Sequence, residues 1–300
     1  MTIDFSSEDQ ELLSGVVELH VHSMPDVFTR PYDQLTLARQ ARDAGYRAIL
    51  FKSHSAINAD CASLVGQTVR GLGVFGGVVL NRPVGGLNPH AVEAAIRFGA
   101  KEIWMPTMHA AHHIDVFGVP TYPWHTPTVE TGLKGRPLEG ITILTAEGEI
   151  KPEVHEILGL AADADIIVGT GHLSLREVVP LIDAARRQGI TKILVTHPEW
   201  EATRWSVDDQ VTMAEKGAVL EHCINALMPF RAASDPTLMV EAIRRVGAAR
   251  CVMATDYGQY RNPHPIEGMR HFIHLMMELG ITRTEIDVMT KANPSKLLGL

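Results

Sequence analysis

The chain has 300 residues, 45% of them hydrophobic, which is enough to bury a core as one large α/β domain or two smaller ones. Its formal net charge of −8 argues against a nucleic-acid partner, because proteins that bind a phosphate backbone present a basic surface. The sequence shows no apolar stretch long enough for a membrane span, no paired cysteines and no signal-peptide pattern at its acidic start, so we expect a cytoplasmic protein.

Short apolar runs rich in Val and Ile alternate with longer amphipathic stretches along most of the chain. Such runs predict buried strands, and the stretches between them predict helices. The predicted strands are 16–22, 48–52, 77–80, 102–106, 166–169, 192–196, 218–221 and 251–255. The predicted helices are 32–44, 59–70, 90–98, 152–162, 175–188, 206–216, 236–246 and 267–279, several of which are followed by glycine.

Eight strand–helix units in a chain of 300 residues predict a (β/α)₈ barrel of the TIM type, with a doubly wound open sheet as the competing architecture. We find no internal repeat and no linker, so we predict a single domain over residues 1–300.

One region interrupts the regular alternation of strands and helices. Residues 107–140 are rich in Pro, Gly and His and have no clear periodicity, and the run that follows reads as a small hairpin turning at Gly148. Loops of this length are usually functional or disordered, and the aromatic residues here argue against disorder. We therefore predict that residues 107–150 form an inserted flap and hairpin over the end of the fourth strand.

The first predicted strand ends in His20-Val21-His22. Side chains alternate along a strand, so these two imidazoles point to the same side and make half of a metal site. In a chain with 15 histidines such a pair could arise by chance. Its weight comes from ligand-type residues at the ends of three later predicted strands, His172, His197 and Asp256.

More polar side chains lie at or just after the ends of the second and seventh predicted strands: Lys52, His54, Glu221 and His222. In a barrel, catalytic groups lie where the strands end. Imidazole and carboxylate ligands suit zinc, with manganese or iron as alternatives, and the lack of paired cysteines argues against a structural zinc site. Adjacent residues of a strand point to opposite sides, so at most one of Glu221 and His222 faces the centre, and we favour His222.

At these positions the chain resembles the amidohydrolase superfamily of metal-dependent hydrolases, which has His-x-His on strand 1, His on strands 5 and 6, and Asp on strand 8. The resemblance spans almost the whole chain. It implies that His20, His22 and Asp256 bind one divalent ion and that Asp256 is also the base that activates water. It further implies that His172 and His197 bind a second ion, or that one of them joins the first ion while the other contacts the substrate.

The chain departs from this family at the group that bridges two ions. Family members commonly use a carboxylated lysine or a glutamate from strand 4, and the fourth predicted strand has neither at its carboxyl end. Two roles stay open for Lys52 on the second strand: a carboxylated bridge between ions, or a cation that holds a substrate carboxylate or an oxyanion. The number of ions, one or two, stays open with it.

Several residues near the predicted strand ends are candidates for contact with a substrate. These are His54, Arg82, His109, His222 and Asn225, together with Arg30. For His54, ordinary polar packing is an equally supported interpretation, and for the two arginines the proposed partner is a substrate carboxylate.

The expected reaction is attack of metal-activated water on an amide, cyclic amide, imide or ester bond of a small molecule, with the metal and Lys52 stabilising the oxyanion. One alternative is a one-metal decarboxylase or C–C lyase of the same superfamily. Another is a phosphoesterase of the PHP family, which residues 19–26 and the Lys-Ser-His run also resemble, although that family's strand 3 glutamate is not apparent. A metal-free binding barrel is the third. We expect neither a nucleic-acid nor a membrane partner, and homo-oligomerisation stays open.

Overall fold

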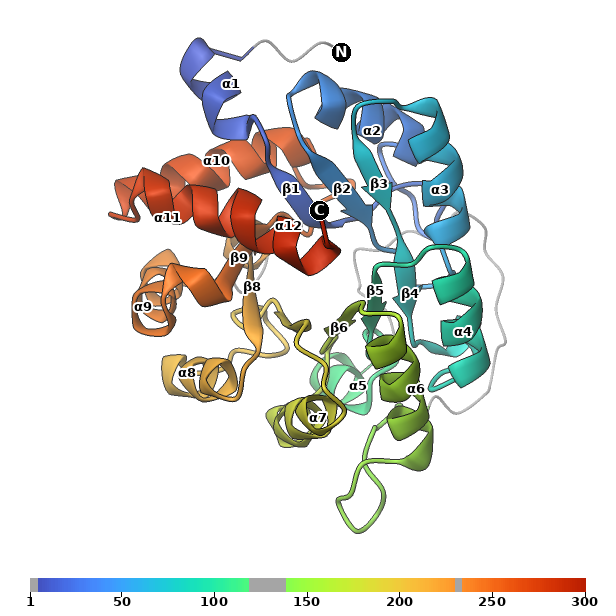
Figure 1. Ribbon diagram of the computed structural model, residues 1–300. Helices are drawn as coiled ribbons and strands as arrows, with labels where there is room; N and C mark the ends of the chain where they lie inside the picture. The colour runs from blue at the N-terminus through green and yellow to red at the C-terminus, as the bar shows by residue number, and fades with distance from the viewer. Residues whose placement is uncertain (1–4, 119–138, 230–233) are drawn as a thin grey trace.

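The computed structural model describes residues 5–118, 139–229 and 234–300, which form a mixed α/β fold. Strands lie at its centre and helices surround them (Figure 1). The strands are β1 (Val17–Val21), β2 (Ala48–Phe51), β3 (Gly73–Phe75), β4 (Gly77–Val79), β5 (Glu102–Trp104), β6 (Ile167–Gly169), β7 (Ile193–Thr196), β8 (Val219–Cys223) and β9 (Cys251–Ala254). Every strand pair is parallel, which confirms the predicted α/β class.

The strands form two sheets, β1-β2-β3 and β4-β5-β6-β7-β8-β9, in chain order. The third predicted strand corresponds to β4, and the additional strand β3 precedes it across Gly76. Asn58 lies in this break: its Oδ1 accepts from the amide of Gly77 at 2.8 Å, and its Nδ2 donates to the carbonyl of Phe51 at 2.9 Å. A Cβ on residue 76 would lie 2.7 Å from the carbonyl oxygen of Asn58, so this close approach requires glycine.

The first and last strands also lie side by side. The amide of Asp256 donates to the carbonyl of His20 at 2.8 Å, and the amide of His22 donates to the carbonyl of Tyr257 at 2.7 Å. An open sheet leaves its two edge strands apart, whereas a barrel brings them together. These hydrogen bonds place the carboxyl end of β1 against the segment that follows β9.

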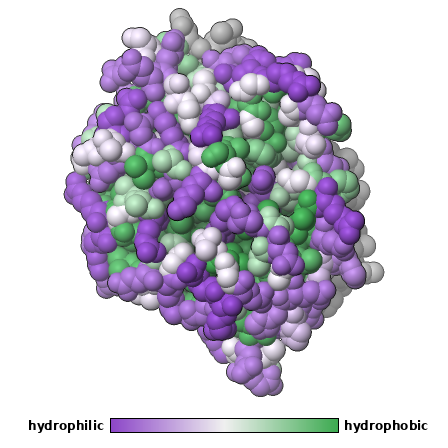
Figure 2. Space-filling view, in the orientation of Figure 1, coloured by the Kyte–Doolittle hydropathy of each residue, from purple (hydrophilic) through white to green (hydrophobic). Residues whose placement is uncertain are grey.

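The helices are α1 (Ser7–Leu13), α2 (Gln34–Asp43), α3 (Ala59–Thr68), α4 (Pro89–Arg97), α5 (Ala111–Phe117), α6 (Pro152–Asp163), α7 (Leu175–Arg187), α8 (Val207–Glu215), α9 (Pro236–Val246), α10 (Pro265–Glu278), α11 (Arg283–Asp287) and α12 (Asn293–Leu298). Each helix predicted between strands is present, with small differences at its ends. None of the described helices is both long and apolar enough to cross a membrane. On the face shown in Figure 2, hydrophilic and hydrophobic residues are interspersed.

The predicted insertion is described only in part, because residues 119–138 lie outside the described residues. Before that stretch it contains α5. After it, the hairpin is present as predicted: Leu144 and Ile150 pair antiparallel, and Gly148 turns the chain with a φ of +88°. The placement of a flap over the end of the fourth strand stays a prediction.

Glu177 connects this hairpin to the start of α7. Its Oε2 accepts from the amide and hydroxyl of Ser174, at 3.0 and 2.7 Å, and forms the capping box of the helix. Its Oε1 accepts from the hydroxyl of Thr142 at 2.7 Å and from the amide of Ile143 at 3.1 Å. One carboxylate therefore fixes both the helix start that follows His172 and the base of the hairpin.

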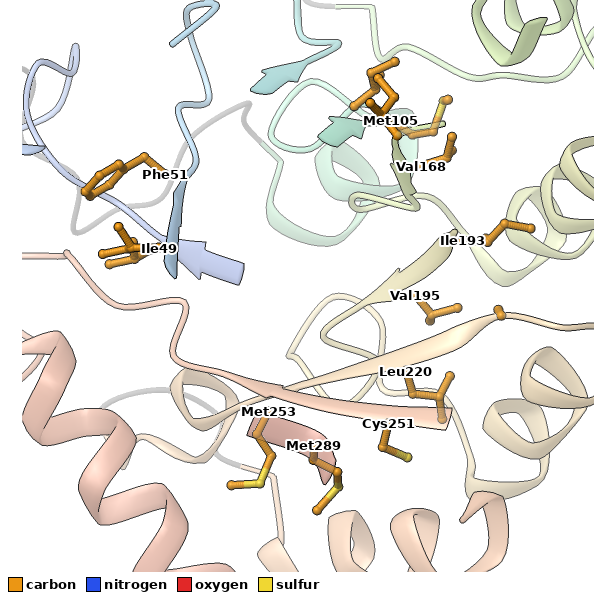
Figure 3. Close-up of a cluster of buried hydrophobic side chains, with 14 of the residues drawn as sticks. Ile49, Phe51, Met105, Val168, Ile193, Val195, Leu220, Cys251, Met253 and Met289 are labelled. Atoms are coloured by element: carbon orange, nitrogen blue, oxygen red, sulfur yellow. The ribbon is translucent and has the colours of Figure 1, made fainter. Parts of the chain in front are cut away.

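Apolar side chains form an inner and an outer layer of core. The inner layer includes Val17, Leu19, Ala48, Leu50, Val79, Trp104, Ile167, Leu194 and Val252. The outer layer, between strands and helices, includes Ile49, Phe51, Val168, Ile193, Val195, Leu220 and Met253 (Figure 3). Successive residues of a strand alternate between the two layers, so a polar residue in the inner register lies among the strands rather than beneath a helix.

Candidate active site

His20, at the end of β1, is fully buried and has partners at both ring nitrogens. Its Nδ1 lies 3.0 Å from Oε2 of Glu221 on β8, and its Nε2 lies 3.1 Å from Oδ1 of Asp256. Burial and the Lys52 charge lower the pKa of His20, but Asp256 and Glu221 outweigh them and the net shift is upward. The space between His20 and Asp256 therefore favours a positive charge. An imidazole supported by a carboxylate on one nitrogen is the usual form of a metal ligand.

His22 presents the same kind of nitrogen to the same carboxylate. Its Nδ1 lies 2.9 Å from the carbonyl of Lys52, which can only accept, so Nδ1 carries the proton. Burial, together with the charge of Arg30, lowers the pKa of His22 to about 3, so the ring is neutral. Its Nε2 lone pair faces Oδ1 of Asp256 at 3.1 Å. Two electron-pair donors this close repel each other unless a cation lies beside them.

The third member of this group, Asp256, follows β9 and has a φ of +50°. A positive φ is costly for a residue other than glycine, and such strain is concentrated at functional sites. Asn225 donates from Nδ2 to Oδ2 at 2.7 Å, which leaves Oδ1 to face the two histidines. Burial raises the pKa of Asp256, but His20 and His22 hold it well below its usual value. Asn225 thus contacts Asp256, and its contact with a substrate stays a prediction.

The ligand atoms of His20, His22 and Asp256 lie within 4.8 Å of one another. Two imidazoles and one carboxylate form a ligand set of catalytic zinc sites that leaves a position for water. The orientation of both rings, set by Glu221 and by the Lys52 carbonyl, fits a divalent ion at this point.

His172 and His197 lie in the same cluster of rings but are not part of that group of ligand atoms. The ring of His197 stacks on His20 at 5.8 Å between centroids, and the rings of His172 and His197 are 5.1 Å apart. Nδ1 of His172 lies 3.0 Å from Nδ1 of His113, a residue of α5 that was not among the predicted site residues. Burial, above all, holds the pKa of both His172 and His197 well below the usual value.

Lys52, just after β2, is buried, and its Nζ lies 3.0 Å from Nε2 of His20. The ammonium also lies over the ring of Trp104, 5.3 Å from its centroid. Burial lowers the pKa of Lys52, against the opposing charges of Asp256 and Glu221. Lys52 is therefore a direct neighbour of the predicted metal ligands.

Two further buried carboxylates lie within the strands, Glu18 on β1 and Glu102 on β5. Burial raises the pKa of Glu18 to about 7 and raises that of Glu102 well above its usual value. Oε1 of Glu18 accepts from the amides of His20 and Thr255, at 3.0 and 3.1 Å, and so links β1 to the end of β9. Neither residue was predicted from the sequence. The available signal was a glutamate next to the apolar residues of each of two predicted strands.

His54 lies beside the metal group. Its ring stacks on His22 with centroids 4.7 Å apart, and its Nδ1 lies 2.9 Å from the hydroxyl of Thr107. Thr107 is in turn hydrogen-bonded to Asn81, which lies just after β4. Burial, and next the charge of His22, hold the pKa of His54 well below its usual value. Asn81 and Thr107 were not predicted, because neither is a metal-ligand type.

The predicted anion-binding arginines differ in position. Arg82 is exposed and donates to the carbonyl of Glu139, and no hydrogen bond or ion pair among the described residues joins it to the central histidines. His109 is half-buried, and burial and Arg82 lower its pKa to about 4. Arg30 is buried instead; its Nε donates to Asp26 at 2.7 Å, and its Nη2 has no partner among the described residues.

The prediction that His222, rather than Glu221, faces the centre was wrong. Glu221 contacts His20, whereas the neighbouring His222 points away and bonds Oε1 of Glu199 at 2.8 Å. Burial lowers the pKa of His222, but Glu199 reverses the shift and raises it to about 10. Strand β8 ends two residues later than predicted, at Cys223. The strand period alone could not say which of two adjacent residues faces inward.

A cavity of about 560 Å³ lies elsewhere, beside the first turns of α8 and α9. Its lining includes Glu199, Trp205, Gln210 and Asp235, and none of the predicted site residues. Volume alone does not make a reaction centre, whereas the histidine cluster combines buried ligands, strained backbone and shifted pKa values. We therefore place the candidate active site at the histidine cluster.

Several solved structures share this fold. An amidohydrolase from Pseudomonas aeruginosa is 11% identical, with 98% of each chain covered and a TM-score of 0.62. A putative 2-pyrone-4,6-dicarboxylic acid hydrolase from Pseudomonas putida is 14% identical over 95% of this chain and 97% of its own, with a TM-score of 0.59. A 2,6-dihydroxybenzoate decarboxylase is 12% identical over 96% of this chain and 100% of its own, with a TM-score of 0.54. The resemblance to amidohydrolases is thereby confirmed as a likeness of fold.

No curated protein matches the sequence. A family model does match, over residues 15–221, from the residues before β1 to β8. The matched span is more than half of the chain and contains all four predicted histidine ligands, while Asp256 lies beyond it. The chain therefore belongs to DUF6282, a family of unknown function.

Proposed function

We propose that the chain is a metal-dependent hydrolase that acts on an amide, cyclic amide, imide or ester bond of a small molecule. The observation that carries the proposal is the buried group of His20, His22 and Asp256, whose ligand atoms lie within 4.8 Å of one another. The shared fold of the amidohydrolase from Pseudomonas aeruginosa supports the same reaction class.

We infer that the scaffold is a single domain, residues 1–300, with its strands arranged as a barrel. The hydrogen bonds that join the end of β1 to the segment after β9 support this arrangement. The active site then lies at the carboxyl ends of the strands, where enzymes of this fold have theirs.

We infer one divalent ion, held by His20, His22 and Asp256, and favour zinc over manganese and iron because of the imidazole ligands. Such an ion, when bound, lowers the pKa of a water molecule and polarises the bond to be broken. The other potential ligand group among the described residues, His20 with Glu221 and Cys223, shares His20 with the first and so does not add an independent site. His172 and His197 are then available to complete the first site or to contact the substrate.

Asp256 is the general base in this proposal. Its pKa lies well below the usual value, so the carboxylate is ionised at neutral pH and can accept a proton from water. The hydrogen bond from Asn225 fixes Oδ2 and keeps Oδ1 turned to the histidines. The proton then passes from Asp256 to the leaving group.

Lys52 is the electrophilic partner of the substrate oxygen. Burial lowers the pKa of Lys52, while Asp256, Glu221 and Glu102 around it oppose this shift and favour its positive charge. A carboxylated Lys52 would add a further negative charge beside these three carboxylates, so we favour the ammonium over a bridging carbamate. The ammonium stabilises the oxyanion that forms during attack.

The second candidate reaction is decarboxylation of a small carboxylic acid with one bound ion. The observation that favours it is Arg30, a buried cation whose Nη2 has no partner among the described residues. After burial, the Arg30 charge contributes to the lowered pKa of both His22 and His54, which supports a position of Arg30 near the site. A substrate carboxylate would bind this guanidinium in either reaction. The fold shared with a 2,6-dihydroxybenzoate decarboxylase supports this alternative.

The test is the metal content of the purified protein, measured by elemental analysis. We expect about one equivalent of zinc, manganese or iron per chain, lost when His20 and His22 are both replaced by alanine. His271→Ala, a change at an exposed histidine of α10, serves as the matched control and should keep the metal. Absence of metal from the native protein would contradict the proposal and leave a binding function.

The reaction class is tested by a panel of amides, cyclic imides, esters, phosphate esters and aromatic carboxylic acids. Hydrolysis of one of the first three classes, lost in the double histidine variant, is the expected result. Release of carbon dioxide from a carboxylic acid would support decarboxylation instead. Turnover of phosphate esters alone would support a phosphoesterase of the PHP type.

A further inference from the structure

A chain of hydrogen bonds that begins at Asn81 fixes where His54 carries its proton. Oδ1 of Asn81 lies 2.9 Å from the amide of Thr107 and 3.2 Å from the amide of His109. Backbone amides only donate, so the atom facing them must be the carbonyl oxygen of the side chain. The orientation of the Asn81 amide group is thereby determined, and its Nδ2 points the other way.

Nδ2 of Asn81 uses both of its protons. One is donated to the carbonyl of His54 at 2.9 Å, and the other to the hydroxyl oxygen of Thr107 at 2.7 Å. The Thr107 hydroxyl is therefore an acceptor towards Asn81 and keeps its own proton for another partner. Nδ1 of His54, at 2.9 Å, is the only such partner among the described residues.

This sequence of donors makes Nδ1 of His54 an acceptor. A neutral imidazole that accepts at Nδ1 carries its proton on Nε2, so His54 has no lone pair left to bind a metal ion. Its position is nevertheless central, because its ring stacks on His22 at 4.7 Å and approaches His172 at 6.2 Å. The hydrogen bond of the His54 ring to a described residue is the one at Nδ1, and Nε2 forms none within the described part of the chain.

We propose that His54 lies outside the metal shell and that its Nε2–H donates a hydrogen bond to an oxygen of the substrate, with Asn81 and Thr107 as positioning residues. The ligand class is a carbonyl or carboxylate compound, since these offer an oxygen that only accepts. The contact with a substrate rests on the proposed function, whereas the assigned tautomer of His54 does not. In this proposal, His54 belongs to the histidine cluster but does not bind the ion.

The proton position is measured by long-range ¹H–¹⁵N correlation spectra of the full chain labelled at histidine, with His54→Gln to identify the signal. We expect His54 to be protonated at Nε2 and bare at Nδ1. Thr107→Ser keeps the hydroxyl and should leave this pattern unchanged. Thr107→Val removes the hydroxyl and should populate the other tautomer. A native His54 protonated at Nδ1 would overturn the proposal whether or not the protein holds metal.

Metal content separates the donor role from a ligand role. His54→Gln should retain the metal equivalents of the native protein, whereas His22→Ala should lose them. Loss of metal in His54→Gln would overturn the proposal while leaving the metal-dependent function in place. Acetate, a small carboxylate probe, should shift the His54 Nε2–H resonance in a saturable way, and a resonance that does not respond would overturn the substrate contact.

Discussion

Individual residues of the site are assigned by what their neighbours can donate or accept. The carboxylate of Glu221 and the backbone carbonyl of Lys52 accept from Nδ1 of His20 and of His22, so both rings offer Nε2 to Asp256. The residue types of this group were predictable from the sequence, because ligands follow strand ends. The supporting acceptors were not, since one is a backbone atom and the other lies 201 positions along the chain.

The general base is the residue whose loss should be most selective. Asp256→Asn keeps the shape of the side chain and the possibility of a bond to Asn225, but it removes the charge. We expect turnover to fall by about 10²–10⁴-fold, the usual contribution of general acid–base catalysis. With metal removed from both proteins, the midpoint of thermal unfolding should change little. The matched control is Asp43→Asn, whose side chain is 65% exposed. Native activity in Asp256→Asn would remove Asp256 from the mechanism.

At the scale of elements, seven of the eight predicted helices combine an amphipathic period with a cap or a following glycine, and the eighth, α6, begins at a proline instead. The division of the third strand was not predictable. It depends on the hydrogen bond between Asn58 and the amide of Gly77, which lies 19 positions further along the chain. Which residues of β8 face inward could likewise not be predicted. A period of two predicts that side chains alternate between the two faces, but not which set faces the centre.

The connection between β7 and α8 is joined to β8 by the buried pair of His222 and Glu199, 2.8 Å apart. The pKa of His222 in the folded protein is about 10, above the ordinary value of 6.5. A group with a raised folded pKa contributes stability that is complete below 6.5 and is lost as pH rises towards 10. We expect the free energy of unfolding to fall over this range.

Urea unfolding of the native protein and of Glu199→Gln, at a series of pH values between 6 and 10, measures this dependence. The variant lacks the carboxylate that raises the pKa, so its stability should change less over the same interval. Equal slopes for the two proteins would show that the pair does not couple folding to protonation. Asp43→Asn again provides a surface control.

For the whole molecule, the site joins segments that are remote in sequence. His20 lies on the first strand and His22 directly after it, and Asp256 follows the last strand. An ion bound by all three would cross-link the two ends of the strand order and bind only the folded protein. Ligands that bind only the native state raise its stability in proportion to the logarithm of their concentration.

Removal of metal should therefore lower the midpoint of thermal unfolding of the native protein, and added zinc should restore it. We expect neither effect in the variant with alanine at positions 20 and 22. His271→Ala should respond as the native protein does. Calorimetry before and after chelation makes the comparison, and an unchanged midpoint on chelation would place any bound metal outside the strands.

Glu177 has a consequence for how this fold can change over time. The same carboxylate closes the first turn of α7 and holds Thr142 and Ile143 of the hairpin. A hairpin of different length or sequence would withdraw two donors and disturb the helix start next to His172. The insertion and the loop between β6 and α7 are thus expected to diversify together, as one inherited module. A transplant of the hairpin into a related scaffold should succeed only when Ser174 and Glu177 travel with it.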